Sequence, residues 1–347
     1  MGSFLKICGF PESAAINLVA GRFMNFVCKL WECRMTIEEC RIRNVDRTTM
    51  NTRRAFVRNL SALAFTAPLL AETPKPKNKI CFFTKHLIGL GYDDIASLGA
   101  EMGVDGIEAP IRPKSGHLTP EQVVDELPKF VEALKKQNLD MMIMTSGINE
   151  VSAEQRTEEV LRTAAKLGVK RFRMNYFKYD LKQPIWEQLQ AIRPKIKDLV
   201  ALCKEVGIQP MFQNHSGQDY FGAPVWDIFS IMREYPAEQF SFAFDILHAT
   251  CEGGKSWPLE FNLVKDHIGA AYFKDYKWEG RKLVTVPLGE GQVDPAYGKM
   301  LMKTGYSGPI SLHVEYLEGN PKDPAVLKGF REAHLRDMKT LKGWLQS

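Results

Sequence analysis

The stretch Gly207–Gly217, which reads GIQPMFQNHSG, decides the expected fold of this chain. Its first half is apolar and lies between a glycine and a polar turn, which is typical of a short, buried, parallel strand. Its second half places Gln213, Asn214 and His215 where that strand would end. Side chains at the carboxyl ends of parallel strands form the ligand sites of open α/β sheets and of (β/α)8 barrels. The stretch therefore predicts an α/β fold with a site at this edge.

Strands and helices alternate on both sides of this stretch. Short apolar runs predict strands at 80–84, 104–109, 139–145, 170–175, 208–214, 240–245, 268–274 and 309–315. Amphipathic runs predict helices at 92–102, 120–137, 152–167, 186–206, 224–234, 257–266, 295–304 and 323–345. Eight strand–helix units predict one (β/α)8 TIM barrel as a single domain. A doubly wound sheet is the alternative, but no Gly-x-Gly-x-x-Gly turn follows the first strand.

The overall composition is that of a globular protein, with 45% hydrophobic and 25% charged residues in 347 positions. The formal charge of +5 and the pI near 8.7 would by themselves suggest a nucleic-acid partner. Residues 1–71, however, hold ten of the 46 Lys and Arg and five of the 41 Asp and Glu, which leaves 36 of each. A barrel region without net charge has no electrostatic attraction for a phosphate backbone, so no nucleic-acid partner is expected.

An export signal is expected between Met50 and Ala71. A basic segment with Arg53 and Arg54 precedes an apolar run from Leu60, and a small residue then precedes a polar, proline-rich stretch. The apolar run is shorter than the ~20 residues that a spanning helix needs. The arginine pair resembles the twin-arginine signal, with an amphipathic N-terminal helix as the alternative. The expected location is therefore the periplasm or the outside of the cell, with no stable membrane anchor after cleavage.

The expected domain organisation has three parts. Residues 1–49 precede the signal and are interpreted as an extension that is disordered or translated from too early a start, because an export signal is expected at the N-terminus. Residues 50–71 are the signal, and residues 72–347 form the barrel.

Several motifs of the barrel region occur in the order and at the spacing of one known family. They are Gln213-Asn214-His215, Asp245-Ile246-Leu247-His248, Lys274-Asp275, Pro287-Leu288-Gly289-Glu290-Gly291 and Gly305-Tyr306-Ser307-Gly308-Pro309-Ile310-Ser311-Leu312-His313. Over residues 79–345 the chain resembles the xylose isomerase-like barrels, a group of sugar and sugar-phosphate isomerases and epimerases that also includes apurinic endonucleases. The resemblance implies that the partner is a small-molecule carbohydrate.

The resemblance also implies one divalent cation, held by Glu, Asp, His and Glu on the fifth to eighth strands. In this chain those positions read Gln213, Asp245, Tyr272 and His313. The two-glutamate proton transfer of the family's epimerases is not available, because the amide of Gln213 cannot accept a proton at neutral pH. A metal bound through Gln213, Asp245 and His313 is one expectation, with Mn or Mg favoured over Zn by oxygen-rich ligation. A metal-free site is the alternative.

Proton transfer in this site is assigned to His215, Lys274 and Glu315. Glu315 follows His313 by two residues, so both side chains face the same side of their strand. Contacts to the sugar are expected from residues that close other strands or lie in the following loops, namely Glu108, Asn175, His248 and Trp257. Bonding to loop backbone is the alternative role of Glu108 and Asn175, and loop packing is the alternative for the aromatic residues.

The sequence thus predicts a sugar isomerase or epimerase that moves a proton on a sugar or keto-sugar. Two alternatives stay open: a non-catalytic sugar-binding protein whose metal site has decayed, and a metal-dependent lyase or hydrolase that acts on keto-sugars. An abasic-site nuclease is not expected, because it would need three metals and a basic face for DNA.

Overall fold

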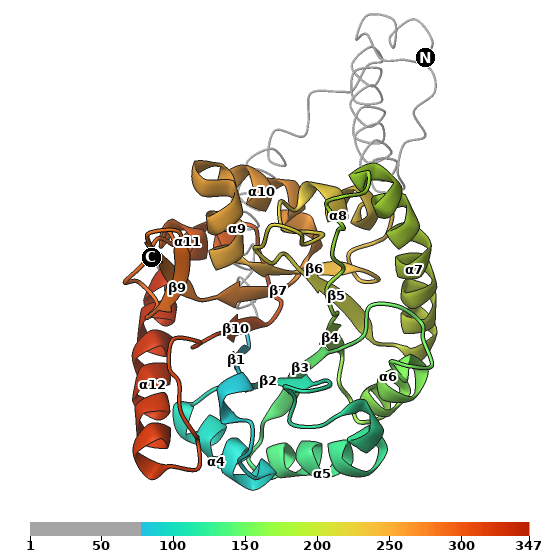
Figure 1. Cartoon of the computed structure of the whole chain (residues 1–347). Helices are drawn as coiled ribbons and strands as arrows, with labels where there is room; N and C mark the ends of the chain where they lie inside the picture. The colour runs from blue at the N-terminus through green and yellow to red at the C-terminus, as the bar shows by residue number, and fades with distance from the viewer. Residues whose placement is uncertain (1–77, 347) are drawn as a thin grey trace, which may run out of the picture. The chain divides into compact units, whose positions relative to one another are not determined.

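Eight parallel strands close into a barrel in the computed structural model, which describes residues 78–346 (Figure 1). The strands are β1 (Ile80–Phe83), β2 (Gly106–Ile111), β3 (Asp140–Ser146), β4 (Arg171–Arg173), β5 (Gln209–Gln213), β6 (Ser241–Asp245), β7 (Ile268–Phe273) and β10 (Ile310–Leu312). Neighbours in the chain pair in parallel, and β10 closes the ring by pairing with β1. Each predicted strand overlaps one of these strands, and the predicted (β/α)8 TIM barrel is confirmed.

A ring of helices surrounds the barrel (Figure 1). These are α4 (Tyr92–Met102), α5 (Val123–Lys136), α6 (Thr157–Lys166), α7 (Ile185–Val206), α8 (Trp226–Met232), α9 (Ile246–Gly253), α10 (Trp257–Val264), α11 (Ala296–Lys303) and α12 (Pro324–Gln346). Short 3-10 turns lie at Lys85–Leu87, Pro120–Gln122, Gly254–Ser256 and Lys265–His267. Every predicted helix corresponds to one of the α-helices, whereas α9 was not predicted.

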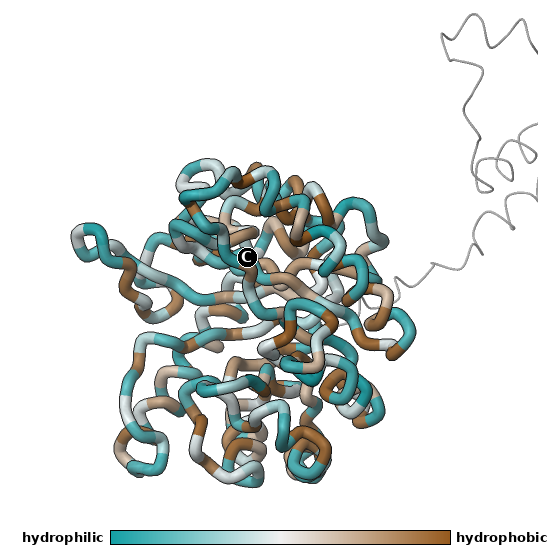
Figure 2. The backbone as a smooth tube through the Cα atoms, turned by 45° about the vertical axis from the view of Figure 1, so that its right-hand side comes forward, coloured by the Kyte–Doolittle hydropathy of each residue, from teal (hydrophilic) through white to brown (hydrophobic). Residues whose placement is uncertain are grey.

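Hydrophobic and hydrophilic residues alternate at short intervals along the helices (Figure 2). In α5, Leu127, Phe130, Val131 and Leu134 are buried, and this spacing places them on one helical face. Burying a side chain of this size contributes about 1.5–3 kcal/mol, so one apolar face holds each helix against the barrel. Within residues 78–346, no helix is long and apolar enough to cross a membrane.

Alternate strand residues fill the barrel interior, because successive side chains of a strand point to opposite faces. An apolar inner layer consists of Cys81, Ile143, Met211, Ala243, Ala270 and Tyr272. Two residues further along two of these strands, the inward positions become polar: Gln213 follows Met211, and Asp245 follows Ala243. Buried polar groups therefore lie at the carboxyl ends of the strands, which is the catalytic end of (β/α)8 barrels.

Helix α9 begins immediately after β6, without an intervening loop. Asp245 ends the strand and caps the helix, because its Oδ1 accepts hydrogen bonds from the backbone amides of Leu247 (3.1 Å) and His248 (3.4 Å). No turn residues separate the two elements, so the sequence pattern did not reveal this helix. The capping arrangement leaves the second oxygen of Asp245 for contacts inside the barrel.

An antiparallel hairpin of β8 (Asp275–Glu279) and β9 (Lys282–Val286) follows β7 and was also not predicted. Its base is fixed by the buried Asp275, whose carboxylate accepts hydrogen bonds from four backbone amides at 2.8 to 3.0 Å. The amides belong to Tyr276, Gly289, Gly291 and Val293. A Cβ at Gly291 would lie 2.2 Å from the carbonyl oxygen of Tyr276, so this position needs glycine. The glycine motif at 287–291 is thus a loop held by Asp275.

Candidate functional site

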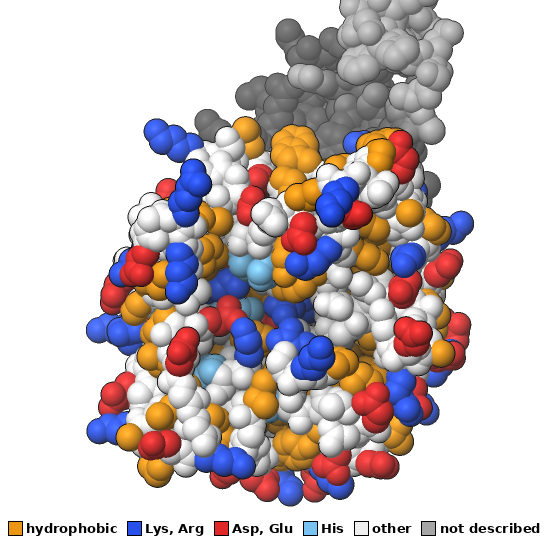
Figure 3. Space-filling view, in the orientation of Figure 1, with side chains coloured by type: hydrophobic (Ala, Val, Ile, Leu, Met, Phe, Trp, Pro, Cys, Tyr) orange, Lys and Arg blue, Asp and Glu red, His pale blue; other side chains and the backbone are white. Residues whose placement is uncertain are grey.

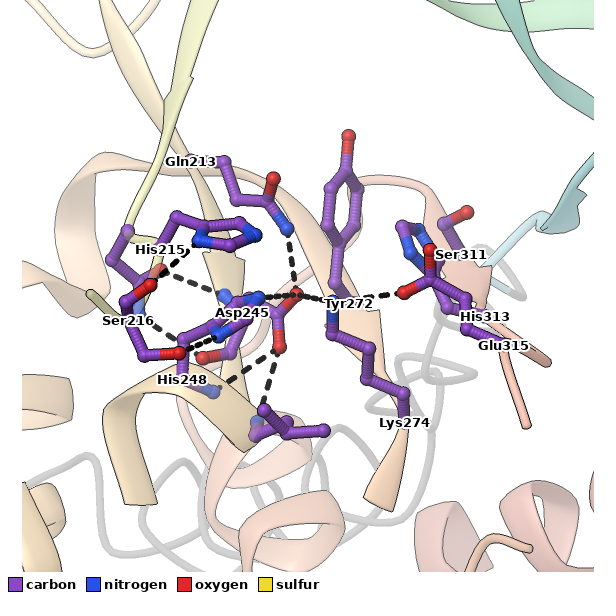
Figure 4. Close-up of polar contacts among 12 residues, drawn as sticks. Gln213, His215, Ser216, Asp245, His248, Tyr272, Lys274, Ser311, His313 and Glu315 are labelled. Carbon is purple, nitrogen blue, oxygen red and sulfur yellow. Dashed lines mark hydrogen bonds and ion pairs between the residues drawn. The ribbon is translucent and has the colours of Figure 1, made fainter. Parts of the chain in front are cut away.

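The face of the barrel shown in Figure 3 is hollowed at its centre. Histidine, basic and acidic side chains gather on the floor of this hollow. Figure 4 shows the polar cluster at the carboxyl ends of β5, β6, β7 and β10, with Asp245 near its middle. Gln213, His248 and Lys274 lie around Asp245, and Glu315 contacts Lys274. The structure therefore brings Lys274 and Glu315, which the sequence assigned to catalysis, from separate strands to the surroundings of Asp245.

Lys274 bridges two carboxylates in this cluster. Its Nζ lies 3.1 Å from Asp245 Oδ2 and 3.1 Å from Glu315 Oε2, and the Lys274 side chain is 6% exposed. Burial by itself lowers the pKa of Lys274, but Asp245 and Glu315 outweigh it and raise the pKa above its ordinary value. Burial likewise raises the pKa of Glu315, but Lys274, His313 and Lys85 hold it well below its ordinary value. Lys274 and Glu315 are therefore both charged at neutral pH.

The amide of Gln213 has a fixed orientation. Its Nε2 donates to Asp245 Oδ2 at 2.6 Å, and its Oε1 accepts from Arg173 Nη1 at 2.7 Å and from the Tyr176 hydroxyl at 2.5 Å. A guanidinium group can only donate and an ionised carboxylate can only accept, so these partners determine which end of the amide faces Asp245. The carbonyl oxygen of Gln213 therefore points away from Asp245.

His215 and His248 lie together beside Asp245, with ring centroids 4.0 Å apart (Figure 4). Nδ1 of His248 lies 2.8 Å from Ser216 Oγ, and its Nε2 lies 3.6 Å from Asp245 Oδ2. Burial and the nearby Lys274 lower the pKa of His215 to about 3 and that of His248 well below its ordinary value. Both rings are neutral at pH 7, which suits hydrogen bonds with hydroxyl groups better than proton delivery.

Glu108 lies deeper in the barrel and is fully buried. Its two oxygens accept hydrogen bonds at 2.5 to 3.0 Å from Thr145, Tyr272, Ser311 and His313. Burial by itself raises the pKa of Glu108, but His313 and Arg173, whose Nη1 lies 4.0 Å away, help to lower it to about 2. Both oxygens are therefore occupied inside the barrel, and the expected sugar contact of Glu108 does not fit this placement.

Trp257 lies apart from the cluster, whereas Asn175 directly precedes Tyr176. The ring of Trp257 packs 6.1 Å from that of Tyr297, which in turn contacts the outward-facing Phe244 of β6. Trp257 thus lies between barrel and helices, and the expected sugar contact does not fit it. Asn175 is exposed after β4, and its backbone amide donates to the carbonyl oxygen of Ile148 at 2.8 Å. A sugar contact of the Asn175 side chain stays a prediction.

Two residues of the cluster, Arg173 and Ser216, were not selected from the sequence, and Tyr176 was expected only as one of the aromatic residues in the loops at this end of the barrel. Arg173 is buried at an inward position of β4, and an arginine within an apolar strand is a usable signal, because a buried charge needs a partner. Tyr176 follows in the next loop and contacts Gln213. Ser216 gave no signal beyond its place beside His215.

The predicted metal ligands Gln213, Asp245 and His313 do not fit a metal in this geometry. Gln213 turns its N–H toward Asp245, and Nε2 of His313 lies 3.0 Å from a Glu108 oxygen. Lys274 contacts Asp245 at 3.1 Å and would repel a cation there. Among residues 78–346, no three His, Cys, Asp or Glu side chains are placed to hold a metal ion. The ligand atoms at these three positions are therefore engaged by other side chains.

Solved structures with low sequence identity share this fold. A xylose isomerase domain protein from Planctomyces limnophilus is 16% identical, with 78% of this chain and 98% of that chain covered and a TM-score of 0.59. D-psicose 3-epimerase from Clostridium cellulolyticum H10 is 12% identical, with 77% and 99% covered and a TM-score of 0.58. The 3-keto-D-glucoside 4-epimerase from E. coli is 15% identical, with 77% and 100% covered and a TM-score of 0.54. A comparison with curated proteins gave no match.

A family model extends the comparison from fold to family. The model of the xylose isomerase-like TIM barrel matches residues 96–337, which is more than half of the chain. The matched segment contains the strand ends that carry Gln213, Asp245, Lys274 and Glu315. This protein belongs to the xylose isomerase-like TIM barrel family.

Proposed function

We propose that this protein moves a proton at a carbon next to the carbonyl group of a sugar or keto-sugar, as an isomerase or epimerase does. The observation that carries the proposal is the buried Lys274 ammonium beside Glu315, whose side chain is 20% exposed. The names of two proteins with the same fold, a D-psicose 3-epimerase and a 3-keto-D-glucoside 4-epimerase, support a carbohydrate as the substrate class.

In this proposal Lys274 stabilises the charge that develops on the substrate oxygen. An ammonium group that donates to a carbonyl oxygen stabilises the enolate formed when the neighbouring C–H bond breaks. The Glu315 carboxylate takes the proton. Its pKa is held down partly by Lys274, so Glu315 becomes more basic as the ammonium engages the substrate oxygen. The same two groups therefore act in one step.

His215 and His248 supply contacts on the other side of Asp245 from Glu315 (Figure 4). Their neutral imidazole rings can donate hydrogen bonds to sugar hydroxyl groups or accept hydrogen bonds from them. These contacts orient the substrate over Lys274. His215 is assigned a hydrogen bond with a hydroxyl group near the second face of the reacting carbon. Glu315, which carries the proton after the first step, returns it to the substrate.

Glu315→Gln is expected to lower kcat/KM by about 100-fold or more, because it keeps the side-chain shape and removes the base. Lys274→Met is expected to cause a loss of similar size, because one electrostatic stabiliser is removed. The measurement is exchange of substrate C–H for deuterium in D2O, followed by NMR over a panel of keto-sugars. Lys277→Met is the matched control, since Lys277 lies on the hairpin and its side chain is 49% exposed. Full exchange in Glu315→Gln would contradict the assignment of the base.

A non-catalytic sugar-binding protein is the second candidate. It is favoured by the loss of the family's ligand types at Gln213, Tyr272 and His313. Calorimetry with the same sugars distinguishes the two functions, because a binding protein would show saturable heat without deuterium exchange. A keto-sugar lyase or hydrolase would share the binding site and release a second product, which the NMR spectra would show.

We also propose that the protein is exported, on the basis of residues 50–71, which lie outside the described residues. Changing both Arg53 and Arg54 to Lys is expected to leave the precursor in the cytoplasm, because the twin-arginine pathway reads this pair. A reporter fused after Ala71 measures the effect in fractionated cells. Equal export of the reporter with and without the two arginines would exclude this pathway.

A further inference from the structure

We infer that the Lys274 ammonium is a built-in cation that takes the place of a divalent metal in this site. The inference deepens the proposed function, because it identifies what polarises the substrate oxygen. Its metal-binding consequence stands without that function.

The carboxylates of the site are already paired with ammonium groups. Asp245 and Glu315 are the two carboxylates that a cation would need, and Lys274 lies 3.1 Å from an oxygen of each. Glu315 has a second cationic partner, Lys85, with Nζ 3.3 Å from Oε1. Both carboxylates are thus already neutralised by ammonium groups. A divalent ion at Asp245 would have to displace the Lys274 ammonium, which has little other space because its side chain is 6% exposed.

Both oxygens of Asp245 are occupied by hydrogen-bond donors. Oδ1 accepts the backbone amides of Leu247 and His248, and this bond starts helix α9. Oδ2 accepts the amide of Gln213 and the ammonium of Lys274. Every one of these partners donates N–H, so neither oxygen presents a free direction to a metal.

The other positions where the family resemblance implies ligands are engaged as well. If Gln213 turned its carbonyl oxygen toward Asp245, its NH2 group would face the guanidinium of Arg173 at 2.7 Å. The hydroxyl of Tyr272 and Nε2 of His313 both face Glu108 at 3.0 Å. Nδ1 of His313 has no partner among the described residues, but one nitrogen does not make a metal site.

An ammonium group has three N–H groups and so makes a limited number of contacts. Lys274 carries three N–H groups and uses two on Asp245 and Glu315. One N–H remains for a substrate oxygen. A divalent cation would chelate two neighbouring oxygens, whereas Lys274 binds one. The inferred substrate is therefore a ketone or aldehyde that contacts Lys274 through its carbonyl oxygen alone, while its hydroxyl groups contact His215 and His248.

The test measures Mn2+ binding by calorimetry on the full chain after treatment with a chelator. The parent protein is expected to bind no Mn2+ at this site, and its turnover is expected to be unchanged by the chelator. The double variant Gln213→Glu with Lys274→Ala restores a carboxylate and removes the ammonium, so its affinity for Mn2+ should exceed the upper limit measured for the parent by about 100-fold or more. Gln213→Glu alone should gain less, because the ammonium remains. Lys277→Ala on the hairpin is the matched control for loss of one lysine.

Stoichiometric Mn2+ binding by the parent that Asp245→Asn abolishes would overturn the inference, as would turnover that a chelator removes and Mn2+ restores. Circular dichroism checks the fold of the double variant, and the parent measurements decide the question if that variant does not fold. If the parent binds no metal and turns over no sugar, the proposed function fails while the absence of a metal site stands.

Discussion

The folded barrel is expected to lose stability steeply as the pH falls below about 6.5, because five histidines inside it are held neutral. The five are His86, His117, His215, His248 and His334. Burial lowers the pKa of His117 and His334 to about 4 and that of His215 to about 3. An unfolded chain would take up these protons from pH 6.5 downward, whereas the folded chain does so only near the lowered values. Each histidine then costs up to about 1.4 kcal/mol per pH unit, against a total stability of about 5–15 kcal/mol.

Urea unfolding at a series of pH values between about 7.5 and 4 measures the free energy of unfolding over the range in which these histidines titrate. His334→Phe is the variant of choice, because a phenyl ring can keep the contacts with Phe82 (5.1 Å) and His86 (4.6 Å) and cannot be protonated. It should move the acid transition to lower pH. A stability that stays constant from pH 7 to 4.5 would show that these histidines titrate normally in the folded protein.

Glu108→Gln is expected to destabilise the barrel by about 3–5 kcal/mol, the usual cost of breaking a buried ion pair by removing one partner. The substitution leaves Arg173 without its carboxylate and turns an NH2 group toward side chains that donate to Glu108. Urea unfolding at pH 7 measures the loss. Glu132→Gln on α5 is the matched control, because the Glu132 side chain is 69% exposed and should change little.

The pH dependence separates this effect from that of the histidines. The pKa of Glu108 is lowered to about 2, so its contribution is complete above about 4.5 and disappears as the pH falls through about 2. The difference in stability between Glu108→Gln and the parent should therefore be constant from pH 7.5 to 5. A difference that vanishes near pH 6 would mean that the carboxylate is protonated far more easily than its surroundings indicate.

The barrel could be predicted because its strands are short apolar runs bounded by turn residues, and the order of strands follows the chain. The site could be predicted where a polar residue ends a strand, as at Asp245 and Gln213. Glu108 was placed at the end of a strand over 104–109, but β2 continues to Ile111, so the carboxylate lies inside the barrel. Strand boundaries are the least certain part of a sequence pattern. Here the strand ends two residues later than predicted, and this difference moves Glu108 from the end of the strand to its interior.

The sequence pattern did not show which side chains of neighbouring strands contact each other. Lys274 and Glu315 lie 41 positions apart, and nothing local indicates that their side chains meet. Trp257 was expected at the sugar because it is aromatic and near a strand end. It begins α10 instead, where a large apolar side chain is buried against the barrel. Composition cannot tell these two environments of a tryptophan apart.

The carboxylate of Asp275 fixes the base of the β8–β9 hairpin next to the site. It ties the two ends of the β8–β9 segment together at their base, one residue after Lys274. The tip at Gly280 is joined to the barrel through that base, so a change of length there need not move the ammonium group. The Thr285 hydroxyl of β9 also donates to the carbonyl oxygen of Glu315 at 3.1 Å. The exchangeable part is therefore the tip near Gly280, where evolution or design can alter the length of the hairpin while the chemistry beneath it is kept.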